Sequence, residues 1–542
     1  MEEQFRVLEI NGHLLEHATL KDVIRDRGAR FGDRTFAAIE GDELTYADAD
    51  ARANRVANAL AGLGVAKGDV VVTYMYNSVD HLVAWFACAK LGAIWAPVNI
   101  ALINLDLAYT LIDAGPKVAI IDAELWDNFA KVREQVDVPG MIPVVHGAID
   151  DRSVPEFASL LEGADGEPDV TVLPSDPAGI IYTGGSTGLP KGVIVANLWY
   201  FPALVRYDEM FGVRPDDVHM GVGQMCHAIG SAVDVLCPFY YGLKTVMTKW
   251  FSASKFWDIA FEHRTTIVGV LIGPLMVALD NQPPRADEAD NPLRIASSGS
   301  GQVPRDRIES FKRRFGVELL EIYGQTETGP LGAVGQRLGD QPYHSLGKPH
   351  GWCEVRVVDE HDQERPPGVE GEITLRSTVP YSFMVGYHNK PDKFAEACRN
   401  LWFHSGDVGH QDENGYLHFG GRLSHSIRRR GENISALEVE SAVLLHDAIA
   451  EAAVVGVEAD LGEEDVKVFV QLEEGATLEP GQLIRFLEER IAYFKVPRYV
   501  ELIDTMPRSA TKNEIERFKL RERGVGDAWD RELEGFSVRR RV

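Results

Sequence analysis

Apolar and polar residues follow two different periods along the chain. Residues 45–63 begin with a threonine and carry apolar side chains at three- and four-residue spacing, which predicts a helix. Short apolar runs at 69–74, 94–98 and 118–121 predict buried strands, and 83–91 predicts another helix. Strands that alternate with helices in this way are typical of a parallel sheet joined by crossover helices.

The strand pattern recurs at 267–272 and 318–322, and then the character of the sequence changes. Between residues 352 and 375, apolar and polar residues alternate one by one, as in antiparallel strands with one solvated face. A basic run follows Gly421, and further helix and strand patterns continue to about residue 521. We therefore expect an α/β fold with a large domain over 1–422 and a small α+β domain over 423–542.

The amino-acid composition is typical of a soluble globular protein. The chain has 542 residues, of which 45% are hydrophobic and 25% charged. This length predicts about three to four folding units. Acids outnumber bases by 82 to 55, which gives a formal net charge of −27. That balance argues against a nucleic-acid surface and against general attraction to anionic membranes, but it allows a local basic pocket for a phosphorylated ligand.

The cysteines and the apolar stretches of the sequence indicate the cellular compartment of the protein. The five cysteines are scattered and form no CxxC pair, so we expect reduced thiols. The N-terminal residues lack the basic segment and apolar run of a signal peptide. The most apolar stretch, 81–97, contains Lys90 and is shorter than the about 20 residues that a bilayer span needs. We expect a cytoplasmic protein without an integral membrane segment, and transient membrane contact stays open.

Residues 182–192 hold a dense set of polar groups, between two apolar runs. Four glycines allow the backbone to turn its N–H groups toward a ligand, and three hydroxyls and a lysine add donors. Such a segment suits a polyphosphate. A hairpin turn is the alternative, although a turn needs only about two to five residues. A Walker loop is excluded because Lys191 follows Pro190 rather than glycine.

This segment resembles the signature loop of the adenylate-forming superfamily, which includes acyl-CoA synthetases, peptide-synthetase adenylation domains and luciferases. The usual serine-glycine-threonine is replaced by glycine-glycine-serine at 184–186. The resemblance extends over nearly the whole chain. It implies parallel and mixed sheets with a β-barrel-like subdomain in the large domain, a mobile small domain, and binding of ATP, Mg²⁺ and CoA. The implied phosphate-binding residues are Thr183, Gly184, Gly185, Ser186, Thr187, Gly188 and Lys191.

The segment 321–328 combines an aromatic ring, hydroxyls and a carboxylate. By itself it fits a polar strand end equally well. The resemblance implies that Tyr323 stacks on adenine, that Thr326 contacts phosphate and that Glu327 binds Mg²⁺, which takes one or two protein oxygens beside phosphates. The remaining residues implied at the nucleotide are Gly324 and Gln325 in this motif and Ser300, Gly301 and Gln302 in a small-residue loop upstream.

Two further segments resemble family motifs. Asp407 and Arg422 match the residues that hold ribose, although an aspartate after glycine is commonly a turn residue. His227 lies in a segment similar to the carboxylate site, and its apolar neighbours also fit a core histidine. A metal site with Cys226 is rejected because no second Cys/His pair has ligand spacing. A Cys–His hydrolase is disfavoured because adjacent side chains do not face each other as required.

The dense basic patch at 428–433 reads Arg-Arg-Arg-Gly-Glu-Asn. Alone it fits a solvated surface. In the family this stretch receives CoA, whose phosphates suit arginines. A glycine leaves room for the pantetheine arm. The string is similar to carnitine/crotonobetaine-type CoA ligases and related fatty-acyl synthetases. The implied CoA residues are Arg428, Arg430, Gly431 and Glu432.

Two positions depart from the family pattern. The hinge position, usually aspartate or lysine, is Ser424, whose small side chain still tolerates rotation. The segment 507–514 resembles the one whose lysine drives adenylation, but Lys512 comes one place early and Asn513 occupies the expected site. A register shift would let Lys512 serve, and a weakened adenylation step is the alternative.

Together these motifs predict an ATP-dependent carboxylate–CoA ligase with an acyl-adenylate intermediate. The expected catalytic residues are Lys512, Glu327, Thr183 and His227. Small and apolar pocket candidates favour a fatty or other apolar carboxylic acid; they are Val222, Met225, Cys226, Ile229, Ser300, Thr328 and Leu331. Two alternatives stay open: an acyl-AMP ligase that loads a carrier protein, and a non-catalytic acyl or nucleotide binder, which Asn513 supports. Homodimers are common in the family that the chain resembles.

Overall fold

The chain forms two compact units. The computed structural model describes residues 8–10, 12–136, 138–185, 188–271, 273–299, 305–340, 345–423, 426–429, 432–458, 464–491, 495–509 and 514–536. The larger unit comprises residues 1–183, 189–355 and 375–403, and the smaller unit comprises 184–188, 356–374 and 404–542.

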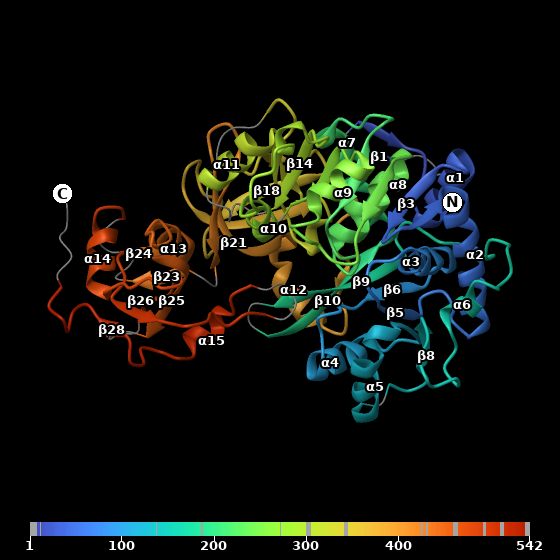
Figure 1. Ribbon diagram of the computed structural model, residues 1–542, viewed down its shortest axis with the longest axis horizontal. Helices are drawn as coiled ribbons and strands as arrows, with labels where there is room; N and C mark the ends of the chain where they lie inside the picture. Colours follow the sequence, from blue (N-terminus) through green and yellow to red (C-terminus); the bar gives the residue numbers. More distant parts are fainter. Residues whose placement is uncertain are drawn as a thin grey trace. The chain divides into compact units, whose positions relative to one another are not determined.

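The larger unit contains a seven-stranded sheet, to which β5, β6, β9 and β10 belong (Figure 1). Its strands, in spatial order, are β20 (Gly386–Tyr387), β10 (Gly188–Ala196), β9 (Pro177–Gly185), β6 (Ile94–Pro97), β5 (Val70–Tyr74), β7 (Val118–Asp122) and β8 (Ile142–His146). Strands β9, β6, β5, β7 and β8 pair in parallel, and β20 pairs with β10 in antiparallel fashion. The strands predicted at 69–74, 94–98 and 118–121 are therefore confirmed.

A nine-stranded sheet contains the second set of predicted strands. In spatial order it consists of β17 (Lys348–Pro349), β16 (Val334–Gly335), β15 (Glu318–Tyr323), β14 (Ile295–Gly299), β13 (Ile267–Val270), β11 (Val218–Gly221), β12 (Lys244–Met247), β3 (Thr35–Ile39) and β4 (Asp42–Thr45). The strands from β15 to β3 pair in parallel, and β4, β16 and β17 add antiparallel edges. This mixed arrangement confirms the predicted α/β class.

Helix α3 (Val79–Leu91) is packed between the two sheets, since it contacts strands of both. Every one of its residues except Asp80 is buried, which explains why this stretch is the most apolar of the chain. The helix begins four residues before the prediction, because the Ser78 side chain caps it by accepting a hydrogen bond from the His81 amide. Among the described residues, no helix has the length and apolar character needed to cross a bilayer.

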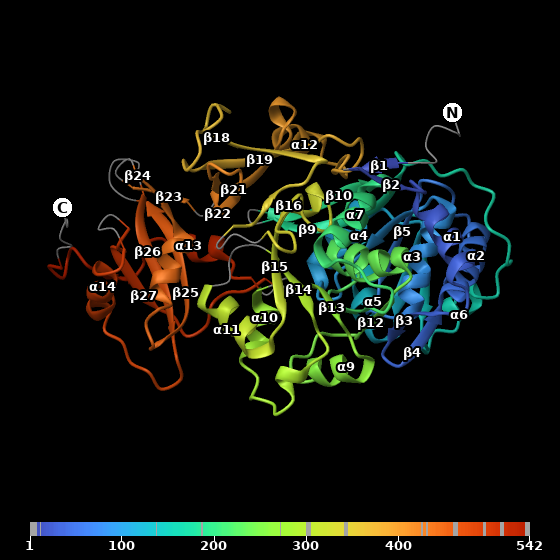
Figure 2. The ribbon, with the colours of Figure 1, turned by 90° about the horizontal axis from the view of Figure 1, so that it is seen from above.

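Helices α1 (Leu20–Phe31) and α2 (Tyr46–Gly62) pack together beside α3 (Figure 2). Helix α2 confirms the prediction for 45–63, and Thr45 is its cap. The remaining α-helices of at least eight residues among the described residues of this unit are α4 (Asn104–Ala114), α5 (Trp126–Gln135), α7 (Phe201–Phe211), α9 (Phe256–His263), α10 (Gly273–Asp280) and α11 (Arg305–Phe315). Helices α4 and α5 cover one face of the seven-stranded sheet with apolar side chains.

The buried Lys90 side chain holds the connection around Glu167 against helices α2 and α3. The Lys90 side chain is 0% exposed and forms ion pairs with Asp50 and with Glu167, whose Oε2 lies 2.8 Å from Nζ. The Lys21 ammonium donates to the Pro168 carbonyl at 2.7 Å. A buried charge is tolerated only when it is paired in this way. The connection around Glu167, although mostly exposed and between regular elements, is therefore tied to the buried Lys90 of the core.

Replacing His146 with glutamine should lower the free energy of unfolding at acidic and neutral pH but hardly at alkaline pH. Burial opposes its charge, but hydrogen bonds to Asp122 and Asp80 raise the pKa of His146 to about 9. Because the folded pKa exceeds the unfolded value, the stabilisation is complete below about pH 6.5 and is lost as pH rises through about 9. We expect a loss of about 1–3 kcal/mol near pH 6 and almost none near pH 10. Equal losses in denaturant titrations at both pH values would contradict this linkage.

A four-stranded sheet has most of its residues in the smaller unit. Its strands are β18 (Cys353–Val358), β19 (Gly371–Ser377), β21 (Phe403–Gln411) and β22 (Leu417–Arg422), in that order. Strands β21 and β22 are antiparallel and place Asp407 opposite Arg422. The β-rich region predicted from residue 352 onward is this sheet.

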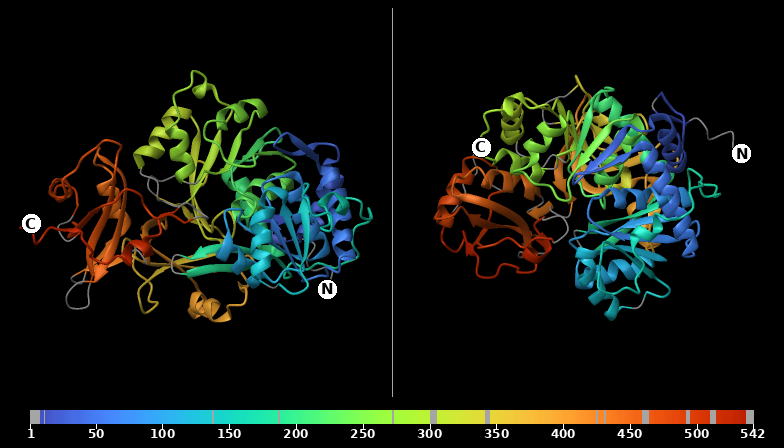
Figure 3. Two further views of the ribbon diagram at one scale, coloured as in Figure 1. Left: turned by 60° about the horizontal axis from the view of Figure 1, so that its bottom comes forward. Right: turned by 45° about the vertical axis from the view of Figure 1, so that its right-hand side comes forward.

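The C-terminal part of the smaller unit is the predicted α+β fold. The hairpin of β23 (Ser426–Arg429) and β24 (Glu432–Ser435) precedes a sheet of β25 (Ile449–Glu458), β26 (Glu464–Leu472), β27 (Tyr499–Leu502) and β28 (Trp529–Asp530). The orange strands β25 and β26 of this sheet are antiparallel neighbours, and β25 forms its edge (Figure 3). Helices α13 (Ala436–Val443) and α14 (Pro480–Glu488) bury apolar side chains against it.

Candidate active site

The signature segment 182–192 occupies the ends of two neighbouring strands. Strand β9 continues through Gly185 and β10 begins at Gly188. The prediction of an eleven-residue loop is therefore too long, because the two strands include most of these residues. The Thr183 hydroxyl donates to the Lys191 carbonyl at 3.4 Å across the two strands.

Helix α4 supports this strand pair from the side. The Tyr182 hydroxyl donates to Asp113 Oδ2 at 2.9 Å, and the Tyr109 hydroxyl donates to the Pro190 carbonyl at 3.2 Å. The ammonium of Lys390 lies 3.1 Å from the other oxygen of Asp113. Burial and the Asp113 carboxylate raise the pKa of Tyr182 well above its usual range, so the phenol remains a donor. Both strands that carry the signature residues are thus held at fixed positions.

A carboxylate, a phenol and an ammonium converge beside β10. Glu327 is 7% exposed and lies in the 3₁₀ turn Thr326–Thr328, which follows β15. The Tyr387 hydroxyl donates to Glu327 Oε1 at 2.8 Å, and Lys191 Nζ lies 4.5 Å from the centre of the Tyr387 ring. Burial and the Glu327 charge raise the pKa of Tyr387 above its usual range, so it stays a neutral donor. The structure thereby joins two predicted residues through a tyrosine that the sequence motifs do not mark.

The turn that carries Glu327 is closed by its own polar groups. The Gln325 amide donates to the Thr328 hydroxyl at 3.0 Å, and the Trp199 indole donates to the Thr326 carbonyl at 3.0 Å. A side chain at Gly324 would meet the Gly332 Cα at 2.7 Å, so this position requires glycine. These contacts fix the backbone on both sides of the carboxylate.

Three other predicted nucleotide residues lie on strands, Tyr323 on β15, Asp407 within β21 and Arg422 at the end of β22. Tyr323 is the last residue of β15 and is 3% exposed. Asp407 is 2% exposed and is the cross-strand partner of Arg422, so the structure brings the two predicted ribose residues together. The contacts of all three with a nucleotide stay predictions.

His227 follows β11 and precedes the π-helix η4 (Ile229–Leu236). Its Nε2 lies 3.3 Å from the Asn99 side-chain nitrogen. Burial raises the pKa of the neighbouring Cys226 to about 12, so its thiol is protonated at neutral pH and is a poor nucleophile. All five cysteines lie in the described chain and are free thiols, as predicted.

Several predicted residues lie outside the described residues, and their roles stay predictions. They are Ser186, Thr187, Ser300, Gly301, Gln302, Ser424, Arg430, Gly431, Lys512 and Asn513. Arg428 and Glu432 lie on the paired strands β23 and β24, where their register partners are Asn433 and Arg429.

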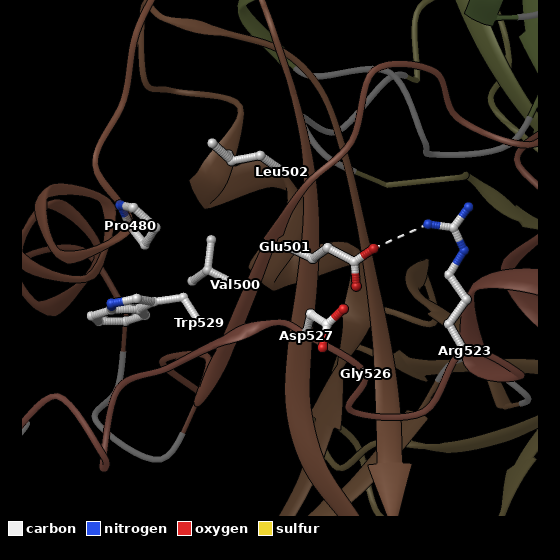
Figure 4. Close-up of a pocket in the computed structure, with 8 residues that line it drawn as sticks. All are labelled: Pro480, Val500, Glu501, Leu502, Arg523, Gly526, Asp527 and Trp529. Carbon is white, nitrogen blue, oxygen red and sulfur yellow. Dashed lines mark hydrogen bonds and ion pairs between the residues drawn. The ribbon is translucent and has the colours of Figure 1, made fainter.

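A hollow in the smaller unit contains none of the predicted site residues (Figure 4). Its Glu501 carboxylate lies 3.0 Å from Arg523 Nη1 and 2.6 Å from the buried Lys467 Nζ. Two cations therefore pair with Glu501, one of the two acids that line this hollow. The arrangement explains how the fold tolerates Lys467, and it points to no chemistry of its own.

Comparison with known proteins shows the family. The chain belongs to the AMP-binding enzyme family, whose model matches residues 24–388, and the AMP-binding enzyme C-terminal domain matches residues 438–513. The predicted membership of the adenylate-forming superfamily, and with it the class of AMP-forming CoA ligases, is thereby confirmed.

Individual relatives agree with this assignment. The crotonobetaine/carnitine–CoA ligase of Salmonella arizonae is 30% identical over 518 residues, which cover 92% of this chain and 98% of the relative. The anthranilate CoA ligase AuaEII, solved with anthranoyl-AMP, superimposes with a TM-score of 0.82 at 26% identity and covers 93% of this chain and 96% of its own. The o-succinylbenzoate–CoA synthetase MenE of Bacillus subtilis, solved with ATP and magnesium ion, gives a TM-score of 0.80 at 25% identity, with 92% and 98% covered.

Proposed function

We propose that the protein joins a fatty or other apolar carboxylic acid to CoA in two steps at the expense of ATP. The observation that carries the proposal is the convergence of Lys191, Tyr387 and Glu327 beside the signature strands. Relatives that are CoA ligases, one of them solved with ATP and magnesium ion, support the same assignment of ATP, Mg²⁺ and CoA.

In the first step, a carboxylate oxygen attacks the α-phosphorus of ATP and pyrophosphate leaves. The protein contributes placement and neutralisation of charge. Thr183 and Lys191, held by the β9 and β10 strands, would bind the phosphates, and His227 would face the acid. Lys512 would offset the charge that develops during transfer.

The Glu327 carboxylate fits a magnesium ligand. It is buried, and its hydrogen bond comes from a neutral phenol, which fixes Oε1 without neutralising the charge. Mg²⁺ binds such carboxylate oxygens together with phosphate oxygens. When bound, the ion would supply positive charge beside the leaving pyrophosphate.

In the second step, the CoA thiolate attacks the acyl carbon of the adenylate, and AMP leaves with the bonding electrons. The mixed anhydride is activated already, so no nucleophile from the protein is needed. We propose that residues 423–542 rotate about Ser424 between the steps and present the 428–433 patch to CoA. The cytoplasm, which supplies both ATP and CoA, is the compartment that we propose.

A panel of acids tests the assignment. Purified full-length protein with ATP and Mg²⁺ should release pyrophosphate with at least one apolar acid, and addition of CoA should yield the thioester and AMP. Chelation of the metal with EDTA should stop the release, and restored Mg²⁺ should recover it. Absence of pyrophosphate across fatty, aromatic and short-chain acids, even with hydroxylamine as a trap, would contradict the proposal. Release without any thioester would favour loading of a carrier protein.

A further inference from the structure

We propose that Asn77 and Asp234 are positioning residues that hold the backbone before His227. The inference rests on the proposed function, because it gives His227 a place at the acid. The segment concerned, residues 222–228, is called the His227 loop. Its backbone is fastened by buried side chains that come from other parts of the fold.

Asp234 fastens the beginning of the loop. It is 0% exposed and projects from η4, which begins two residues after His227. Its Oδ2 accepts a hydrogen bond from the Gly223 amide at 2.9 Å, and its Oδ1 lies 2.9 Å from His219 Nε2. The other ring nitrogen of His219 lies 2.7 Å from the Tyr207 hydroxyl. A fully buried chain of polar groups therefore ends on a single backbone amide of the loop.

Three glycines make the space for this carboxylate. An added Cβ would lie 2.8 Å from Asp234 Cβ at Gly221 and 3.0 Å from Oδ2 at Gly223, and at Gly269 it would overlap Oδ1. Any side chain at Gly269 would displace the aspartate. Three separate backbone positions are thus shaped around one buried acid, which indicates a specific role for its placement.

Asn77 fastens the middle of the loop from the seven-stranded sheet side. It is 4% exposed and lies between β5 and α3. Its amide nitrogen donates to the Gly223 carbonyl at 3.0 Å and to the Thr248 carbonyl at 3.1 Å, while its oxygen accepts from the Met225 amide at 2.8 Å. The asparagine thus satisfies both a donor and an acceptor of the loop backbone.

The end of the loop rests directly on the start of η4. A Cβ at Gly230 would overlap the Gln224 carbonyl oxygen, so the two backbones touch. The His227 amide donates to the same Gln224 carbonyl at 2.9 Å. With Asn77 and Asp234, these contacts fix the backbone of His227 and hence the direction of its ring. Reaction rates fall steeply when a reacting group is displaced by about 1 Å.

Asn77→Ala and Asp234→Ala should therefore impair the acid-activating step. We expect kcat/KM for the acid to fall about 10- to 100-fold, with little change in KM for ATP. Because both residues act through His227, adding His227→Ala to either variant should cause little further loss. Asp234→Asn should recover most activity, because its oxygen can still accept from Gly223 and the tautomer of His219 can reverse to meet its amide.

Asp217→Ala is the matched control. Asp217 is also buried, pairs with Arg294 at 2.6 Å and accepts from the Arg214 amide, but it precedes β11 at the opposite end of that strand. Asp217→Ala should lower the free energy of unfolding without changing kcat/KM of the folded protein. The free-energy changes of Asp217→Ala and His227→Ala should add in the double variant.

Hydrogen–deuterium exchange of peptides over residues 221–228 supplies a readout that needs no turnover. Exchange should accelerate in Asn77→Ala and Asp234→Ala and stay unchanged in Asp217→Ala. Unchanged exchange, or losses that multiply with those of His227→Ala, would overturn the proposal, and so would normal kinetics together with fast exchange. If the wild-type protein releases no pyrophosphate with any acid, the proposed function fails, and exchange alone decides whether the two side chains hold the loop.

Discussion

Replacing Lys512 with alanine should nearly abolish adenylation and spare the thioester step. A cation at this position would offset charge on the phosphoryl group in transfer, and loss of one such group costs about 10²- to 10³-fold in rate. Pyrophosphate release with acid and ATP measures the first step. Conversion of a synthetic acyl-adenylate and CoA to the thioester measures the second, which needs no group at this position.

Two neighbouring variants sharpen that test. Asn513→Ala decides the register, since a larger loss there than in Lys512→Ala would show that the predicted shift is wrong. Lys519→Ala removes a lysine from α15 (Arg517–Arg521) that pairs with Glu516, and it should leave both steps unchanged. Equal activity of Lys512→Ala and the wild type would exclude Lys512 from catalysis.

Replacing Glu327 with glutamine should lower pyrophosphate release by about 10²-fold or more and raise the Mg²⁺ concentration needed for half-maximal rate. Glutamine keeps the size of the side chain and can still accept from Tyr387, but it removes the negative charge that a hard cation requires. Initial rates over a Mg²⁺ titration at saturating ATP measure both effects.

Two controls accompany the Glu327 variant. Tyr387→Phe keeps the ring near Lys191 and removes only the hydroxyl, so we expect a loss of about 10-fold with a smaller change in the Mg²⁺ requirement. Glu318→Gln, at the other end of β15, removes a carboxylate that pairs with Lys312 and should leave the titration unchanged. An unaltered Mg²⁺ curve in Glu327→Gln would rule out the predicted metal role.

Local patterns predicted the helices and strands that have regular apolar spacing. The sequence predicts helix α2 because Thr45 caps it and its apolar spacing is regular. The sequence does not predict the start of α3, because the polar residues Asp80 and His81 interrupt the apolar pattern there. His81 is nevertheless buried, since its ring lies 2.9 Å from the Thr73 hydroxyl, and burial lowers the pKa of His81 to about 4. A polar residue that is satisfied in the core cannot be distinguished from a surface residue by sequence alone.

The same limit separates the site residues that the sequence could predict from those that it could not. Residues within one motif, such as Thr326 and Glu327, could be predicted because the chain itself keeps them together. Tyr387 could not, because the pairing of β20 with β10 brings it to a glutamate 60 positions earlier in the chain. Asn77 is of the same kind, since its hydrogen-bond partners lie in a loop that is distant in sequence. The glycines of 182–192 predicted a loop because glycine disfavours strands in general, although it permits them.

The buried Lys90 also has a consequence for proteolysis. Residues 161–176, all within the described chain, form neither helix nor strand, and connections of this kind are common first sites of cleavage by proteases. Here, opening the connection would remove Glu167, one of the two carboxylates that neutralise the buried Lys90 ammonium. Proteolytic cleavage within residues 161–176 should therefore require that the surrounding helices unfold first. The resistance of this coil to proteases should then follow the stability of the unit's core rather than that of its surface.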